Sequence, residues 1–579
     1  MPGVSHPARP LVWLYAALGV GFVPIAGMAI GAGGFVAGAI ALGFGALSLG
    51  IARTLHLRIP AVQIVNTAAQ QLTRGNIPET EALLASISPA AARDSLVARA
   101  VATQRALIAL YDGRLQDAEA FATLAIEKRL GILSRSFELP QIASAYAVRA
   151  FARAARGDAA AATSDADVAE MSVDATPEVI ARARLVRALV ASRAAYHEEA
   201  FRTYLASNAR IVLEHAMPRE RALFRALRRM SRSPSRSVYR EPARAMDDRA
   251  PSKLASWIAT VAPEAGAYVE GDRLVAESVD EMPIESAIPS DVRALRAARA
   301  RKSRAAQPGR RRWPTLVLWL VLVSGFVGIW QFLTPSGTTP PGPADTREPS
   351  WLASFIVEMV PVVIVALLFV VFTSWGRRQQ RRLSIARRLA ALGDRDRAKP
   401  ALIDLAKGRN GMLAATAGLE LARLAAQEAD FGEAIARCDA AIARVSGQPL
   451  RAVAVDILLP TLMTESAVAM AARGGLDEAA AELDVLGRDF PTYSQLAAAQ
   501  LRVRLLTAVR EGDRNAACAV ARSRTASMPL PYREDVLADL VLASRGHLSE
   551  EDLARLDGEL LDDAGLRSWL DLVAPGLRC

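Results

Sequence analysis

The residue types that most often carry out chemistry are few and widely scattered in this chain of 579 residues. The five histidines, His6, His56, His197, His215 and His547, lack the HxxxH or HExxH spacing that holds zinc on one helix face. Cys438, Cys518 and Cys579 lack CxxC spacing, so no zinc site or disulfide framework is indicated. The sequence also lacks a credible phosphate-loop, Rossmann, GxSxG, kinase or calcium-loop pattern. We therefore expect no catalytic residue, cofactor or metal, and a protein that is not an enzyme.

Glu358 is the one ionisable residue deep within a long apolar stretch, and Pro361 follows it. Burying a carboxylate in hydrocarbon costs on the order of 2.5–3.5 kcal/mol, so such a residue needs a partner or a proton. Glu358 is thus a candidate ion or proton site for transport, and the alternative is a tolerated residue near the membrane interface. The first apolar stretch holds no matching acid or base, which weakens a transport mechanism.

Two long apolar stretches dominate the sequence. Residues 11–52 carry no charged side chain and are about twice the roughly 20 residues that cross a bilayer as a helix, so two spans with a turn near residues 31–34 are predicted. A signal peptide is the alternative for this stretch. Residues 313–333 and 351–375 form a second pair around a proline-rich turn, and six of the eight tryptophans lie in or beside the four segments. We expect four transmembrane helices in two hairpins.

Basic residues flank these hairpins. Arg9 precedes the first, Arg53 and Arg58 follow it, and a basic run ends at Arg312, directly before the second. Because basic flanks stay in the cytoplasm, we expect a multi-pass protein of the inner cell membrane with both termini cytoplasmic. Arg299–Arg312 then contacts anionic lipid beside the bilayer. A nucleic-acid arm is the alternative reading of this run, but its position against Trp313 favours lipid, and no nucleic-acid partner is expected.

Small turn residues recur every 36–45 residues in the alanine- and leucine-rich remainder. The turn glycines are Gly75, Gly113, Gly157, Gly393, Gly474 and Gly512, and Ala195 and Ala429 take the corresponding places in two further turns. Alanine lies seven residues before most turns and five after them, where two antiparallel helices must approach closely. This pattern resembles the tetratricopeptide repeat at the crossing of its two helices, which implies an α-solenoid that binds proteins. An alanine-rich helical bundle is the alternative.

The two halves of the chain resemble each other. Corresponding turns are separated by 318, 316, 317 and 317 residues. The segments around Trp257 and Trp569, LASWIATVAP and LRSWLDLVAP, are identical at six of ten positions. An internal duplication follows, with each tryptophan helix expected to cap its solenoid, because an end repeat must cover the apolar face of its neighbour. A ligand-binding tryptophan is the alternative.

The predicted fold is all-α: two transmembrane hairpins, each followed by a tetratricopeptide-like helical-repeat domain, with the whole unit duplicated. The expected parts are a cytoplasmic N-terminus (1–10), hairpin 1 (11–52), repeat domain 1 (53–263), an acidic then basic linker (264–312), hairpin 2 (313–375) and repeat domain 2 (376–579). Of the 70 basic residues only five are lysine, and this composition, together with the abundance of alanine, is typical of a GC-rich bacterial genome.

The architecture predicts a membrane-anchored scaffold or adaptor whose repeat domains bind cytoplasmic proteins, with the lipid bilayer as a second partner. The alternative is a transporter or channel component built on the duplicated hairpins. Self-association into an oligomer is left open by the sequence, as is the identity of the bound proteins.

Overall fold

The computed structural model describes twelve main stretches of the chain. They are residues 35–73, 77–128, 141–172, 175–195, 198–232, 253–268, 378–408, 410–445, 458–490, 495–523, 530–548 and 550–575, with short pieces at 16–27 and 374–376 and single residues such as Tyr493. Every regular element within them is a helix. The prediction of an all-α protein is therefore confirmed for the described residues.

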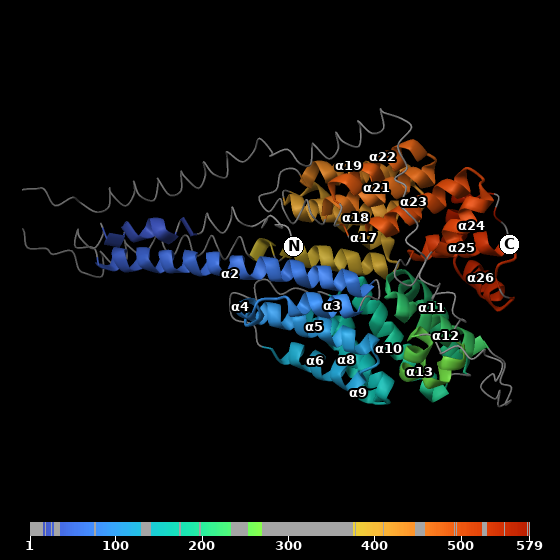
Figure 1. The fold of residues 1–579 in the computed structure, drawn as a ribbon, viewed down its shortest axis with the longest axis horizontal. Helices are drawn as coiled ribbons and strands as arrows, with labels where there is room; N and C mark the ends of the chain where they lie inside the picture. The colour runs from blue at the N-terminus through green and yellow to red at the C-terminus, as the bar shows by residue number, and fades with distance from the viewer. Residues whose placement is uncertain are drawn as a thin grey trace, which may run out of the picture.

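The helices form two arms, which we define as residues 35–268 (first arm) and 378–575 (second arm) (Figure 1). The first arm contains α2 (Phe35–Thr73), α3 (Ile77–Ala85), α4 (Pro89–Ala92), α5 (Ser95–Tyr111), α6 (Leu115–Glu127), α8 (Gln141–Arg156), α9 (Ala159–Met171), α10 (Pro177–Ala195), α11 (Glu199–His215), α12 (Pro218–Arg232), α13 (Lys253–Val261) and a 3-10 helix, η1 (Pro263–Tyr268). The second begins with a helix over residues 378–391 and continues through α17 (Arg395–Lys407), α18 (Gly411–Gln427), α19 (Phe431–Val445), α21 (Leu459–Arg473), α22 (Leu476–Asp489), α23 (Leu496–Arg510), α24 (Arg514–Ser523), α25 (Tyr532–Ala543), α26 (Glu550–Asp562) and α27 (Ala564–Val573).

Both arms are built from antiparallel helix pairs joined by the same kind of turn. Gly113, Gly157, Gly393, Gly474 and Gly512 all have left-handed backbone conformations, with φ between 73° and 101°. At each turn the following amide reaches back to a carbonyl near the helix end, as Asp394 does to Leu389 at 2.9 Å. This arrangement satisfies carbonyls that the helix end leaves free, and glycine adopts it without strain.

Alanine allows the paired helices to pack closely beside these turns. The alanines flanking the turns that are almost completely buried are Ala68, Ala106, Ala118, Ala150, Ala162, Ala188, Ala386, Ala398, Ala422, Ala434, Ala467, Ala479 and Ala517. Ala200, in the same pattern, is exposed. Small side chains at these places let two helix backbones approach, while larger residues such as Phe151 and Leu185 fill the space between layers. The helical-repeat architecture thus rests on close packing at each turn.

The structure contradicts the expectation of four transmembrane helices. Among the residues described, no helix is both long and apolar enough to cross a membrane. The second expected hairpin, with Glu358, lies almost entirely outside the described residues, as do Arg299–Arg312. The placement as a multi-pass protein of the inner membrane depended on these spans and is corrected with them.

The first expected hairpin also has different boundaries from those predicted. α2 does not end at Ala52 but runs from Phe35 to Thr73, and its second half is the first helix of the first repeat, packed on α3 and α5. Arg58, in the middle of this helix, forms an ion pair with Asp94 at 2.7 Å. The absence of charge before Arg53 therefore marks part of a longer helix and not a separate element.

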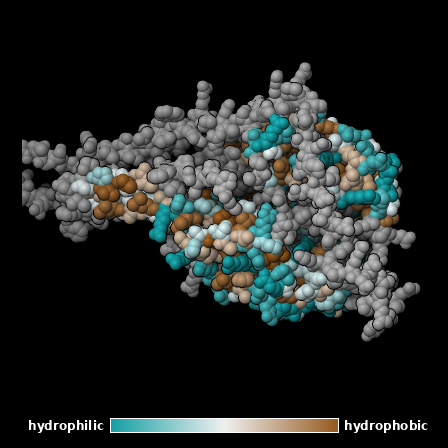
Figure 2. Space-filling model, in the orientation of Figure 1, coloured by the Kyte–Doolittle hydropathy of each residue, from teal (hydrophilic) through white to brown (hydrophobic). Residues whose placement is uncertain are grey.

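The N-terminal part of α2 extends beyond the packed helix pairs of both arms and lies against a short helical piece within residues 16–27 (Figure 1). A Cβ atom on Gly19 would lie 3.0 Å from the carbonyl oxygen of Gly45, so glycine lets the two backbones meet. Figure 2 shows apolar residues gathered at this end, and Leu42 and Leu49 are exposed there.

Candidate functional site

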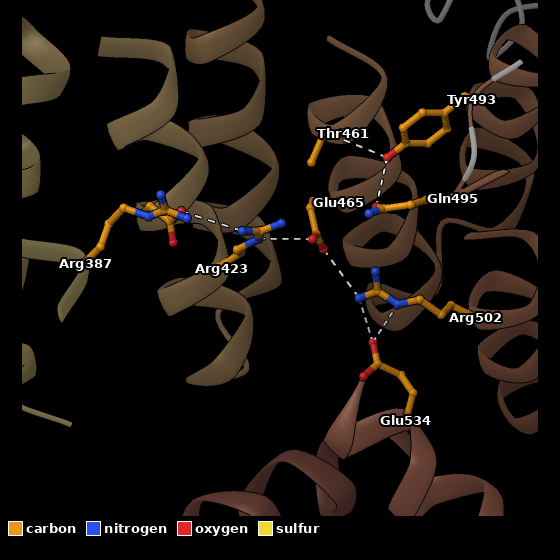
Figure 3. Close-up of polar contacts among 9 residues, drawn as sticks. Arg387, Arg423, Thr461, Glu465, Tyr493, Gln495, Arg502 and Glu534 are labelled. Atoms are coloured by element: carbon orange, nitrogen blue, oxygen red, sulfur yellow. Dashed lines mark hydrogen bonds and ion pairs between the residues drawn. The ribbon is translucent and has the colours of Figure 1, made fainter. Parts of the chain in front are cut away.

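The second arm consists of antiparallel helix pairs, and we call the helix that comes first along the chain in each pair its first helix. A row of alternating charges crosses the first helices of successive pairs (Figure 3). We call it the charge ladder; its members are Arg387, Glu420, Arg423, Glu465, Arg502 and Glu534. They come from the helix over residues 378–391, from α18, α21 and α23, and from α25. Since α21 packs on α18 and α23, and α23 on α25, the ladder follows one continuous layer of helices.

Each charge in the ladder contacts a partner of opposite sign. Arg387 lies 2.9 Å from Glu420, which lies 3.6 Å from Arg423. Glu465 then joins two arginines, accepting from Nε of Arg423 at 3.1 Å and from Nη2 of Arg502 at 3.4 Å. The ladder therefore links three consecutive helix pairs through a single carboxylate.

The far end of the ladder is its strongest contact. Arg502 donates to one carboxylate oxygen of Glu534 from both Nε and Nη2, at 3.0 and 2.7 Å. The side chain of Glu534 is only 6% exposed and that of Arg502 13%. Hydrogen bonds between two charged groups are stronger than those between neutral ones, and here two donors converge on a single carboxylate oxygen.

Burial and neighbouring charge act in opposite directions along the ladder. Burial raises the pKa of Glu465, but Arg502 and Arg423 on its two sides outweigh burial and hold that pKa below its usual value. Burial likewise lowers the pKa of Arg502, and the carboxylates of Glu534 and Glu465 more than offset it. Glu465 and Arg502 therefore stay charged near neutral pH.

Exposure varies along the ladder. The side chains of Arg387 and Arg423 are 32% and 38% exposed, whereas Glu420, between them, is 14% exposed. Glu178 of the first arm is close enough for its carboxylate to interact with both arginines. The accessible end of the ladder therefore presents guanidinium groups and already has a carboxylate beside it.

A neutral polar group lies next to the ladder. Tyr493, in the connection between α22 and α23, has its hydroxyl 3.4 Å from that of Thr461 and donates to Oε1 of Gln495 at 3.2 Å (Figure 3). Burial raises the pKa of Tyr493, so the hydroxyl stays protonated and keeps its hydrogen bond to Gln495. Together with Glu465, the one acidic residue of α21, this group makes the inner layer polar (Figure 3).

The equivalent layer of the first arm has different chemistry. The duplication offsets of 316 and 317 place Leu107, Val148 and Leu185 at the positions of Arg423, Glu465 and Arg502, and all three are buried. Polar contacts remain at the end of the layer, where Glu220 accepts from Arg182 at 2.6 Å and from the hydroxyl of Tyr111 at 2.9 Å. Charge crosses successive pairs in the second arm, whereas the three matching positions of the first arm are apolar.

Trp257 covers the apolar layer of the first arm. Its indole nitrogen donates to the carbonyl of Leu110 at 2.8 Å, and its ring lies 6.0 Å from Tyr111 and 6.2 Å from Phe151. Trp569 lies in α27, which packs on α23 and α26, and the guanidinium of Arg533 is 6.0 Å from its ring. Both tryptophans are buried inside their arms, each against first helices of the repeats.

The other residues singled out from the sequence lie apart from the ladder. The turn glycines lie at the ends of helix pairs, except that Gly75 is outside the described residues. Cys438 and Cys518 are buried separately, and burial raises the pKa of the Cys438 thiol. Across the described stretches, no group of three or more His, Cys, Asp or Glu residues could hold a metal ion.

The ladder itself was missed by sequence reasoning, although a signal was present. Arg387 and Arg423 lie six residues before their turns, Glu420 and Glu465 nine, and Arg502 ten. Spacings of three or four residues keep these charges on one helix face, within segments that are otherwise rich in alanine and leucine. Charged residues on a helix face that is otherwise apolar were the sequence signal for the ladder.

Comparison with known proteins gives no relative: no family model matches the chain, and neither a curated protein nor a solved structure does.

Proposed function

We propose that this chain is a protein-binding scaffold in which the charge ladder of the second arm holds a partner segment that carries carboxylates. The observation that carries the proposal is the ladder from Arg387 to Glu534, laid across successive first helices of a repeat array. Helical repeats bind extended segments along such a layer, since each pair adds one more contact site. The tetratricopeptide-like spacing of the turns supports the same mode of binding.

The chemistry of the accessible end supports an acidic partner. Arg387 and Arg423 are the most exposed members of the ladder and share Glu420 as their carboxylate. Guanidinium groups bind carboxylates with two parallel hydrogen bonds when donors are free to point outward. Glu178, whose charge already acts on both arginines, is an example within the chain of the group that this surface accepts.

A crosslinking experiment with the full chain tests the proposal. A photo-crosslinking amino acid is placed at Arg387, and in a matched control at Arg437, an arginine of similar exposure on the second helix of the neighbouring pair. Illumination in cells should give a discrete crosslinked partner from position 387, and Arg423→Glu should remove it. Crosslinks of equal pattern from both positions, or none from position 387, would contradict the proposal.

A further inference from the structure

One of the contacts between the two arms lies toward their C-terminal ends, where α12 of the first arm lies against α25 and α26 of the second (Figure 1). Arg225 forms an ion pair with Asp535 at 2.7 Å, with both side chains mostly buried, and its Nε lies 3.9 Å from Glu559. Arg221 donates to the carbonyl of Leu530 at 3.0 Å. We call this contact the seam.

The helices of the seam are equivalent copies. Arg219-Glu220 at the start of α12 recurs as Arg533-Glu534 in α25, at an offset of 314 residues. The two copies make similar contacts with partners at different positions of the repeat: Glu220 and Glu534 each bind an arginine of the preceding first helix, Arg182 or Arg502. The guanidinium of Arg219 is 6.0 Å from the ring of Tyr111, as that of Arg533 is from the ring of Trp569.

One pair of equivalent positions lies close enough across the seam for its charges to interact. The offset of 314 makes Asp535 the counterpart of Arg221. Burial lowers the pKa of Arg221 to about 10, while the carboxylate of Asp535 opposes this decrease. In the self-complementary interface of a symmetric dimer, residues close to the two-fold axis likewise lie near their own counterparts.

The charges of the two copies have diverged in opposite directions. α12 contains six arginines and one glutamate, whereas α25 contains one arginine, one glutamate and two aspartates. If both copies carried the sequence of α12, arginine would face arginine at position 221, and two copies of α25 would place aspartate against aspartate. Like charges brought together in a desolvated interface oppose association, and opposite charges favour it.

We infer that the seam is an intramolecular dimer interface whose charges have been divided between the two arms, so that each arm recognises the other arm and not a second copy of itself. The first arm supplies the basic surface of α12, and the second arm supplies Asp535 and Glu559. The inference is independent of what the charge ladder binds.

Cleavage of the folded full chain tests this inference. A protease site is inserted between residues 271 and 312, the purified protein is cut, and light scattering after gel filtration measures whether the fragments stay together. The parent fragments should remain paired one to one. Arg225→Asp and Asp535→Arg should each raise the dissociation constant on the order of tenfold to a hundredfold, as breaking a close interfacial charge pair does.

A double variant with exchanged charges tests whether the pair of Arg225 and Asp535 determines the affinity between the arms. Arg225→Asp with Asp535→Arg reverses the pair and should recover most of the lost affinity. A matched control, Arg382→Asp with Asp404→Arg, reverses an exposed pair within the second arm and should leave pairing unchanged. Helical content measured before cleavage shows whether each variant is folded. Three results would overturn the inference. The parent fragments could separate after cleavage, or each fragment could pair with a second copy of itself. The double variant could also lose as much pairing free energy as the two single variants together.

Discussion

Arg193 and Arg510 make the same contact in the two arms, 317 residues apart. Arg193 donates from Nη2 to the carbonyl of Ala155 at 2.6 Å, and Arg510 donates from Nη2 to the carbonyl of Ala472. Each carbonyl lies two residues before a turn glycine, Gly157 or Gly474. A cation at this place satisfies the C-terminal end of the preceding first helix, and its recurrence is structural support for the duplication.

Removing the shared carboxylate of the charge ladder should destabilise the second arm. In Glu465→Gln, Arg423 and Arg502 lose the negative charge between them, and we expect a loss of about 1–3 kcal/mol, as for charged hydrogen bonds that are partly buried. Urea unfolding followed by circular dichroism measures the change. Glu433→Gln, which breaks the exposed pair with Arg437, is the control and should cost less than about 0.5 kcal/mol.

The same carboxylate should make stability depend on pH in the acid range. The folded-state pKa of Glu465 is lowered, so its contribution is complete above the unfolded value of about 4.3 and is lost as pH falls through the folded value. Lowering the pH below about 4.3 should therefore reduce the urea midpoint of the parent more than that of Glu465→Gln. Parallel pH profiles for the two proteins would refute this assignment.

Ala429 is the one non-glycine residue with positive φ among the residues that the structure describes, at 62°. It occupies the turn position that glycine fills in neighbouring pairs. Ala429→Gly should raise the free energy of unfolding by about 1 kcal/mol, because glycine adopts this conformation without the clash of a Cβ atom. Gly474→Ala, at φ 101° with open space around the missing Cβ, should lower it by a similar amount. Changes of the same sign in both variants would contradict the argument.

Trp257 should contribute strongly to the first arm. Trp257→Ala removes a ring packed between Tyr111 and Phe151 and leaves the carbonyl of Leu110 without its indole donor, so a loss of about 3–5 kcal/mol is expected. Trp257→Phe keeps much of the packing and should cost less. Thermal unfolding measures the stability of both variants. Equal losses of stability would contradict the claim that the packing of an aromatic ring at position 257 stabilises the first arm.

The repeats could be predicted because their signals are local. A turn glycine such as Gly393 and the alanines on its two sides are read directly from the chain, and the structure places these alanines in close helix contacts. The structure adds to the offsets between the halves the equivalent contacts of Arg193 and Arg510.

The spans and the ladder were not predicted correctly for two different physical reasons. Absence of charge gives no boundary for a helix, and α2 continues from its apolar part through Arg53 into the first repeat. The ladder depends on which residues of separate helices meet, and single-helix patterns do not show that Glu465 lies between Arg423 and Arg502. Contacts between distant residues need the tertiary structure.

A peptide-library selection against the intact protein tests the central claim most directly. Random peptides are selected on the parent chain and on Arg387→Glu with Arg423→Glu, and Arg437→Glu serves as the control. The account predicts enrichment of peptides rich in Asp and Glu on the parent and on the control, and its loss on the double variant. Equal enrichment of acidic peptides on all three proteins, or none on the parent, would contradict it.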